Sequence, residues 1–120
     1  MVMKNLVCIV DDDESVRKSL KRLVASFGYE VEAFSSAQSF LDSISPETRG
    51  CIILDLRMPG IDGFSLQRKL KDLRYSMPVI FITAHALPGD REHAMDQGAI
   101  GFLHKPFDEE SLLELIEECV

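Results

Sequence analysis

Three stretches of the chain are almost continuously apolar, and turn-forming residues follow them. They cover residues 6–10, 51–54 and 78–82. A short apolar run bounded by turn residues is typical of a strand that is buried on both faces. The run 51–54 leads directly into Asp55 and is stopped by Pro59 and Gly60. The pattern therefore predicts three buried strands, with Asp55 at the carboxyl end of a central one.

Two weaker strands and five helices are predicted between and after these runs. Residues 29–34 alternate in polarity, as a half-exposed strand does, and residues 100–103 form a short strand. Apolar residues recur at helical spacing in the other segments. The expected helices run from Asp13 to Gly28, from Ser35 to before Pro46, from Asp62 through Leu73, from Asp90 to Gly98, and from about Asp108 onward.

Alternation of strands and helices indicates the fold class. Crossover helices make the sheet parallel and cover both of its faces, which is the doubly wound α/β architecture. The strand order we expect is 2-1-3-4-5, as in flavodoxin-like folds. This order brings Asp11 and Asp12 beside Asp55, and it places Thr83 and Lys105 on the other flank.

The size and the net charge of the chain limit the classes of function that it can have. A chain of 120 residues with 46% hydrophobic and 28% charged residues is expected to form one globular domain over residues 1–120. The formal net charge of −7 argues against contact with nucleic acid or an anionic membrane. It is compatible with a bound cation or with basic partners.

The cysteines and the start of the chain bear on location. The three cysteines, Cys8, Cys51 and Cys119, lie in apolar runs without metal-ligand spacing. We expect free, mostly buried thiols in a reducing compartment, hence a cytoplasmic protein. Residues 1–5 reach an acidic cluster too soon for a signal peptide, and no apolar stretch approaches a membrane span of about 20 residues.

Three carboxylates gathered in one pocket repel one another, so one must take a proton or a cation must bind. A few oxygen ligands suit Mg²⁺, which also bridges to phosphate groups. Asp55 beside Mg²⁺ is then able to attack phosphorus and form an aspartyl phosphate. The Lys105 ammonium and the Thr83 hydroxyl are placed to hold phosphoryl oxygens. The residues predict a site for phosphoryl transfer.

Four motifs at the strand ends resemble the receiver domain of two-component response regulators. They are Val10-Asp11-Asp12-Asp13, Leu54-Asp55-Leu56-Arg57-Met58-Pro59-Gly60-Ile61-Asp62-Gly63, Ile82-Thr83-Ala84 and Lys105-Pro106-Phe107. The form of the second motif, together with Arg17-Lys18-Ser19-Leu20, is most similar to the FixJ-like branch. The resemblance covers essentially the whole chain, with no output domain in it, and it implies a non-enzymatic, phosphoaccepting signalling domain that controls an output, transcription being the expected one.

The resemblance also implies the roles of single residues. Asp55 accepts the phosphoryl group from a phosphohistidine on a sensor histidine kinase or a phosphotransfer domain. Mg²⁺ is bound by the carboxylates of Asp12 and Asp55, by Asp11 mainly through water, and by the main-chain carbonyl of Arg57. Thr83 and Lys105 bind the phosphoryl oxygens.

Further implied roles concern switching. Phe102 matches the aromatic residue that turns inward when Thr83 moves toward the phosphate. Arg57 and His85 stand at positions that tune the lifetime of the phosphate. The peptide bond from Lys105 to Pro106 matches a position where the family favours the cis form. The implied output surface, which also permits a homodimer, is formed by the fourth helix, fifth strand and fifth helix.

Plainer explanations exist for each residue. The acids at positions 11–13 also suit helix capping, Thr83 an ordinary strand end, Lys105 a surface lysine, and Phe102 simple core packing.

Three other classes of protein share some of these features. A phosphatase with an aspartate nucleophile needs a second acid where Arg57 stands. A flavin-binding flavodoxin needs a Ser/Thr/Gly-rich loop where three acids follow the first strand. A receiver that no longer accepts phosphate would lack part of the acid, threonine and lysine set.

Overall fold

The computed structural model describes residues 6–58, 60 and 62–119. Residues 1–5, Pro59, Ile61 and Val120 lie outside the described part. The expectation for the start of the chain, and two residues of the loop motif after Asp55, therefore fall outside it.

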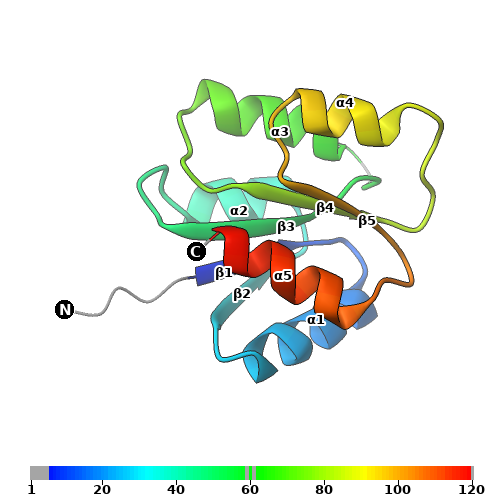
Figure 1. The fold of residues 1–120 in the computed structure, drawn as a ribbon. Helices are drawn as coiled ribbons and strands as arrows, with labels where there is room; N and C mark the ends of the chain where they lie inside the picture. Colours follow the sequence, from blue (N-terminus) through cyan, green and yellow to red (C-terminus); the bar gives the residue numbers. More distant parts are fainter. Residues whose placement is uncertain (1–5, 59, 61, 120) are drawn as a thin grey trace.

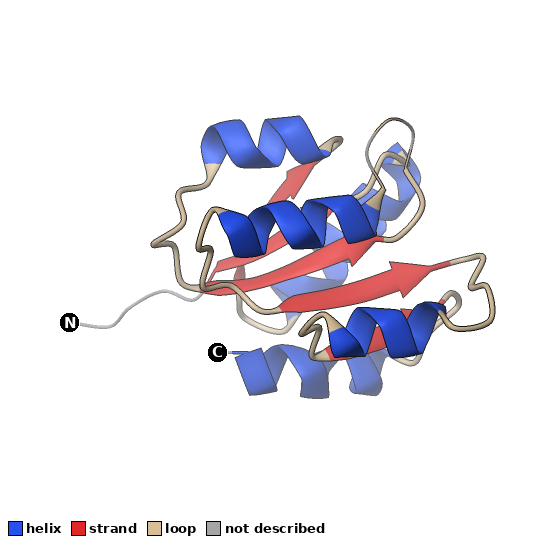
Figure 2. Ribbon diagram, turned by 90° about the horizontal axis from the view of Figure 1, so that it is seen from above, coloured by secondary structure: helices blue, strands red, loops and turns tan. Residues whose placement is uncertain are grey.

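Within the described residues, five strands and five helices alternate, as the pattern of apolar residues predicts. The elements are β1 (Leu6–Val10), α1 (Glu14–Ser26), β2 (Glu30–Phe34), α2 (Ala37–Ser43), β3 (Gly50–Asp55), α3 (Gly63–Asp72), β4 (Val79–Thr83), α4 (Asp90–Asp96), β5 (Gly101–His104) and α5 (Glu109–Cys119). The sheet has the order β2-β1-β3-β4-β5. All neighbouring strands are parallel, and their arrowheads point the same way in Figure 2. The predicted fold class and strand order are confirmed.

Helices cover both faces of the sheet, with α3 and α4 on one side and α1 and α5 on the other (Figure 1). Successive residues of β3 point to opposite faces, so Ile53 packs with α1 and α5 whereas Leu54 packs with α2, α3 and α4. All six residues of β3 are buried. Gly50 begins this strand because a Cβ there would lie 1.8 Å from the carbonyl oxygen of Leu6 on β1.

Side-chain caps fix the starts of three helices. Asp13 accepts hydrogen bonds from the first turn of α1, Ser36 from Ser39 in α2, and Asp62 from Ser65 in α3. These caps agree with the predicted helix starts. The end of α3 differs from the expectation, because the helix stops at Asp72 and Leu73 is 47% exposed rather than packed on the core.

Polar contacts join helix α4 to several neighbouring segments, beside the packing of Ala94 in the core. It has seven residues, and its buried residues are Asp90 and Ala94. It follows Gly89, whose φ of 88° is left-handed and which supplies no side-chain cap. From α3, the buried Gln67 donates a hydrogen bond of 3.2 Å to the carbonyl of Ala94. The sparse apolar content of this helix was evident in the sequence.

The cysteines are free thiols. Cys8 and Cys51 are buried, and Cys119 is partly buried. Burial raises the pKa of Cys8 to about 12. A hydrogen bond with Cys119, together with burial, raises the pKa of Cys51. Thiols held in the protonated form are poor nucleophiles, so these cysteines serve packing. Among the described residues, no helix combines the length and the apolar character that crossing a membrane requires.

Candidate functional site

Three carboxylates converge at the carboxyl edge of the sheet. Parallel pairing sets Val10 beside Leu54, so the next residues of the two strands, Asp11 and Asp55, meet at this edge. One carboxylate oxygen from each of Asp11, Asp12 and Asp55 lies within 4.8 Å of the others. Asp11 and Asp55 are buried, whereas Asp12 is exposed to solvent. The predicted clustering of these acids is confirmed.

The environment of Asp55 disfavours its charge. Burial and the neighbouring carboxylate of Asp11 raise the pKa of Asp55 to about 6, although the Lys105 ammonium partly opposes this. The backbone N–H of Arg57 donates a long hydrogen bond of 3.4 Å to Asp55 Oδ1. A cation bound beside Asp55 would oppose both effects and favour the charged carboxylate.

Asp11 is held in place from several sides. Its Oδ1 accepts a hydrogen bond of 2.9 Å from the backbone N–H of Asp13. Its Oδ2 forms an ion pair of 3.1 Å with Lys105 Nζ. The Arg17 guanidinium donates to the Asp11 carbonyl at 2.9 Å. Lys105 therefore reaches the acid cluster and is held there by its ion pair with Asp11.

Thr83 and Lys105 form the opposite flank. Thr83 is fully buried, and its hydroxyl oxygen accepts a hydrogen bond of 3.1 Å from the His85 backbone. The Lys105 N–H donates to the Thr83 carbonyl at 2.8 Å, which ties the ends of β4 and β5 together. The peptide bond between Lys105 and Pro106 is cis.

These side chains surround one cavity of about 180 Å³. Its lining residues are Asp11, Asp12, Asp13, Asp55, Arg57, Thr83, Ala84, His85 and Lys105. Thr83 and Lys105 therefore line the same cavity as the acids, and Lys105 is partly buried in an ion pair; their roles toward a phosphoryl group stay predictions. Capping applies to Asp13, which both caps α1 and lines the cavity.

The acid cluster fits a divalent cation. It offers carboxylate oxygens, the donors that Mg²⁺ prefers, and its exposed side at Asp12 allows the ion to keep water ligands. Binding of the Arg57 carbonyl to the ion stays a prediction.

Phe102 lies outside the cavity. It is buried on β5, and its ring centroid is 6.3 Å from that of Phe81 on β4. The structure thus shows a core-packing role for Phe102, and its role as a switch stays a prediction. His93 and His104 are exposed.

One residue of this region was missed by sequence reasoning. Asp90, the first residue of α4, is 8% exposed and forms a 2.7 Å ion pair with Arg57. An acid in the first turn of a helix is common, so Asp90 does not by itself indicate a partner 33 positions away. The Pro88-Gly89 pair predicts a turn before α4 but not the direction in which that turn places the helix.

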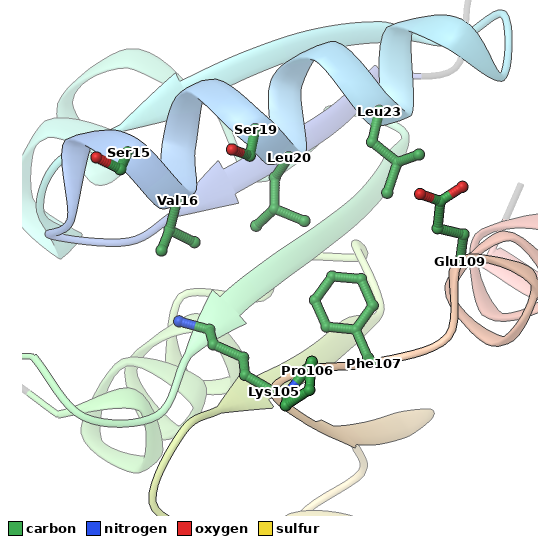
Figure 3. A pocket seen from close by; sticks show the side chains of 9 residues that line it. All are labelled: Ser15, Val16, Ser19, Leu20, Leu23, Lys105, Pro106, Phe107 and Glu109. Carbon is green, nitrogen blue, oxygen red and sulfur yellow. The ribbon is translucent and has the colours of Figure 1, made fainter.

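A larger groove adjoins the cavity at Lys105. It measures about 420 Å³ and lies between α1 and the loop that joins β5 to α5. Figure 3 shows Val16, Leu20 and Leu23 pointing from α1 toward Pro106 and Phe107. The groove is therefore an apolar surface beside the site.

The doubly wound sheet with acids, threonine and lysine at its carboxyl edge defines a phosphoaccepting signalling domain rather than a classical enzyme. The chain belongs to the response regulator receiver domain family, whose model matches residues 7–117. This assignment excludes the flavin-binding and phosphatase alternatives, and the acid cluster lies at the family's active site.

Curated relatives support the same assignment. The chain is 42% identical over 113 residues to nodulation protein W of Bradyrhizobium diazoefficiens, covering 94% of this chain and 50% of that protein. It is 44% identical over 116 residues to the response regulator protein TodT of Pseudomonas putida, covering 97% and 51%. It is 37% identical over 120 residues to the transcriptional regulatory protein FixJ of Bradyrhizobium diazoefficiens, covering 100% and 58%. The chain thus spans about half the length of these relatives.

Solved structures agree with this family and branch. The response regulator StyR superposes with a TM-score of 0.91 at 47% identity, over 98% of this chain and 59% of that one. The structure titled FixJ-N superposes with a TM-score of 0.88 at 39% identity, over 98% and 94%. The expected similarity to FixJ-like regulators is confirmed.

Proposed function

We propose that Asp55 accepts a phosphoryl group from a phosphohistidine of a sensor histidine kinase or a phosphotransfer domain. The observation that carries this proposal is the position of Asp55. Its carboxylate lies at the edge of the cavity, with acids on one flank and with Thr83 and Lys105 on the other. Receiver domains imply a cognate sensor kinase, so the donor is a protein rather than a metabolite alone.

The residues divide the chemistry between them. An oxygen of the Asp55 carboxylate attacks phosphorus, a new O–P bond forms, and the P–N bond to the donor imidazole breaks. The imidazole keeps the electron pair and takes a proton. Lys105 and the Thr83 hydroxyl hold phosphoryl oxygens during this transfer, which needs charge neutralisation more than acid–base catalysis. Lys105 must exchange its contact with Asp11 for one with the phosphoryl group.

The carboxylates of Asp12 and Asp55, Asp11 through water, and the Arg57 carbonyl would hold Mg²⁺, which would supply positive charge so that an anionic carboxylate could approach an anionic phosphoryl group. The clustering of the three carboxylates supports this ligand set. We also assign tuning of the phosphate lifetime to Arg57 and His85, since both line the cavity. Thr83 and Phe102 are the proposed switch residues.

The apolar groove beside Lys105 is the proposed binding site of the donor protein. It shares Lys105 with the cavity, so a donor helix lying in it would carry its phosphohistidine to the edge of the acid site. Replacing the exposed Ser19 with Arg would fill the groove from α1. We expect Ser19→Arg to slow transfer from a phosphorylated kinase while labelling by acetyl phosphate stays unchanged. Equal slowing with both donors would contradict this assignment.

The proposed output is control of transcription through an output domain or partner, with residues 1–120 as one receiver domain. Two observations support it: the similarity to a transcriptional regulatory protein, and the coverage of only about half of that relative.

The proposed switch surface is formed by α4, β5 and α5, and it would form a homodimer upon phosphorylation. Met95 of α4 is 39% exposed on this surface. The net charge of −7 favours protein contacts over DNA contacts for this domain. The free thiols support a cytoplasmic location.

Intact-mass spectrometry after incubation with Mg²⁺ and acetyl phosphate tests the acceptor directly. We expect one added phosphoryl group that hydroxylamine removes. Asp55→Asn should show none, whereas Asp42→Asn, which changes an exposed aspartate on α2, should behave as the wild type. A phosphoryl group that persists in Asp55→Asn, or its absence from the folded wild type, would refute the proposal.

A further inference from the structure

The ion pair between Arg57 and Asp90 joins the loop that follows β3 to the first turn of α4. Arg57 Nη2 lies 2.7 Å from Asp90 Oδ2. The same Asp90 oxygen accepts a hydrogen bond of 2.8 Å from the backbone N–H of Leu87. Arg57 follows Asp55 by two residues and also lines the acid cavity. One guanidinium therefore lies between the phosphoacceptor site and α4.

We propose that Asp90 is a positioning residue that competes with the phosphoryl group on Asp55 for the Arg57 guanidinium. This inference rests on the proposed function, because it concerns the state in which Asp55 bears a phosphoryl group. In the unmodified domain Asp90 holds Arg57. In the phosphorylated domain the phosphoryl group recruits it, and the link to α4 opens.

The Arg57 side chain is suited to such an exchange. It is 38% exposed, so water surrounds part of it and little packing must be broken for it to turn. A guanidinium binds phosphate oxygens with charge-assisted, bidentate hydrogen bonds. Phosphorylation replaces a carboxylate by a group with more negative charge at the same place, which strengthens the pull on Arg57.

The burial of Asp90 favours its ion pair with Arg57 and so opposes transfer of the guanidinium to the phosphoryl group. Its side chain is 11% exposed, and among the described contacts it keeps the Leu87 N–H when Arg57 leaves. A buried carboxylate that loses its cation is unfavourable. The two sites are therefore coupled: holding Arg57 at Asp90 weakens binding of the phosphoryl group, and binding of that group weakens the anchor of α4.

Beryllofluoride, a mimic of the phosphoryl group on a carboxylate, measures this competition at equilibrium. Its affinity is determined by titration calorimetry with saturating Mg²⁺ for the wild type, Asp90→Asn, Arg57→Ala and the double variant. The amide oxygen of Asn keeps an acceptor for Leu87. We expect Asp90→Asn to bind about fivefold more tightly and Arg57→Ala more weakly than the wild type. The double variant should match Arg57→Ala.

The control is Glu92→Gln, which removes a negative charge from the same turn of α4 at an exposed position. It should leave the affinity unchanged. If Asp90→Asn does not fold, Asp90→Ser provides the same comparison, with a hydroxyl acceptor for Leu87.

An unchanged or weaker affinity in Asp90→Asn would overturn the inference. So would an equal gain in the Arg57→Ala background, because that gain would reflect net charge alone. These results differ from failure of the proposed function, in which the folded wild type does not bind beryllofluoride at all.

Discussion

Strand β3 ends at the phosphoacceptor cavity, helix α4 is linked to the cavity residue Arg57 by an ion pair, and the two elements are held in opposite ways. All six residues of β3 are buried, and both of its faces pack on apolar side chains. Helix α4 buries Ala94 and the acid Asp90, and its contacts with Arg57 and Gln67 are polar. Asp55 thus lies at the end of a strand that is packed on both faces, whereas α4 depends in part on single polar contacts. Such contacts can be exchanged one at a time, whereas a packed core must open as a unit.

We expect the largest difference between β3 and α4 in the effect of side-chain truncation on the free energy of unfolding. Ile53→Ala removes a fully buried side chain from β3 and should destabilise the domain by about 3–4 kcal/mol. Met95→Ala on the exposed face of α4 should change stability by less than about 0.5 kcal/mol. Urea unfolding of both variants measures the contrast. Similar losses of stability in Ile53→Ala and Met95→Ala would contradict the difference between β3 and α4.

Asp55 itself should lower the stability of the domain when no cation is present. Its pKa is raised from 3.8 to about 6, so the folded state binds more protons than the unfolded state between these values. Stability therefore falls as the pH rises through this range. We expect Asp55→Asn to stabilise the Mg²⁺-free domain by about 2 kcal/mol near neutral pH, and the gain to vanish near pH 4.

Thermal unfolding as a function of pH measures this effect, with Asp42→Asn as the control for loss of a solvated carboxylate. Saturating Mg²⁺ should raise the melting temperature of the wild type more than that of Asp55→Asn. A gain in Asp55→Asn that persists at pH 4 would show that charge at Asp55 is not its cause.

A smaller effect is expected from His85, which lines the cavity at the start of the connection to α4. We expect His85→Ala to expose the aspartyl phosphate to water and to shorten its lifetime about twofold to fivefold, a change of less than about 1 kcal/mol in the barrier. Loss of radiolabel from the phosphorylated domain measures the rate. His104→Ala, at an exposed position outside the cavity lining, is the matched control. Equal lifetimes for His85→Ala and the wild type would refute its tuning role.

The sequence predicted β3 and the acid site better than it predicted α4 and its contacts. Apolar runs such as 51–54 have few structural alternatives, and parallel order alone brings Asp11 to Asp55. The partner of Arg57 was not predictable, because it depends on how the turn at Gly89 aims α4. The exposure of Leu73 was missed because helical spacing does not reveal that α3 ends at Asp72. Long-range polar contacts of this kind depend on tertiary geometry rather than on local pattern.

Hydrogen exchange in the unphosphorylated domain tests the contrast between β3 and α4 most directly. We predict that amides of β3 exchange only through global unfolding, whereas amides of residues 90–96 exchange through local opening that costs at least about 2 kcal/mol less free energy. Protection of α4 equal to that of β3 would contradict it, because the helix would then be fixed as firmly as the core.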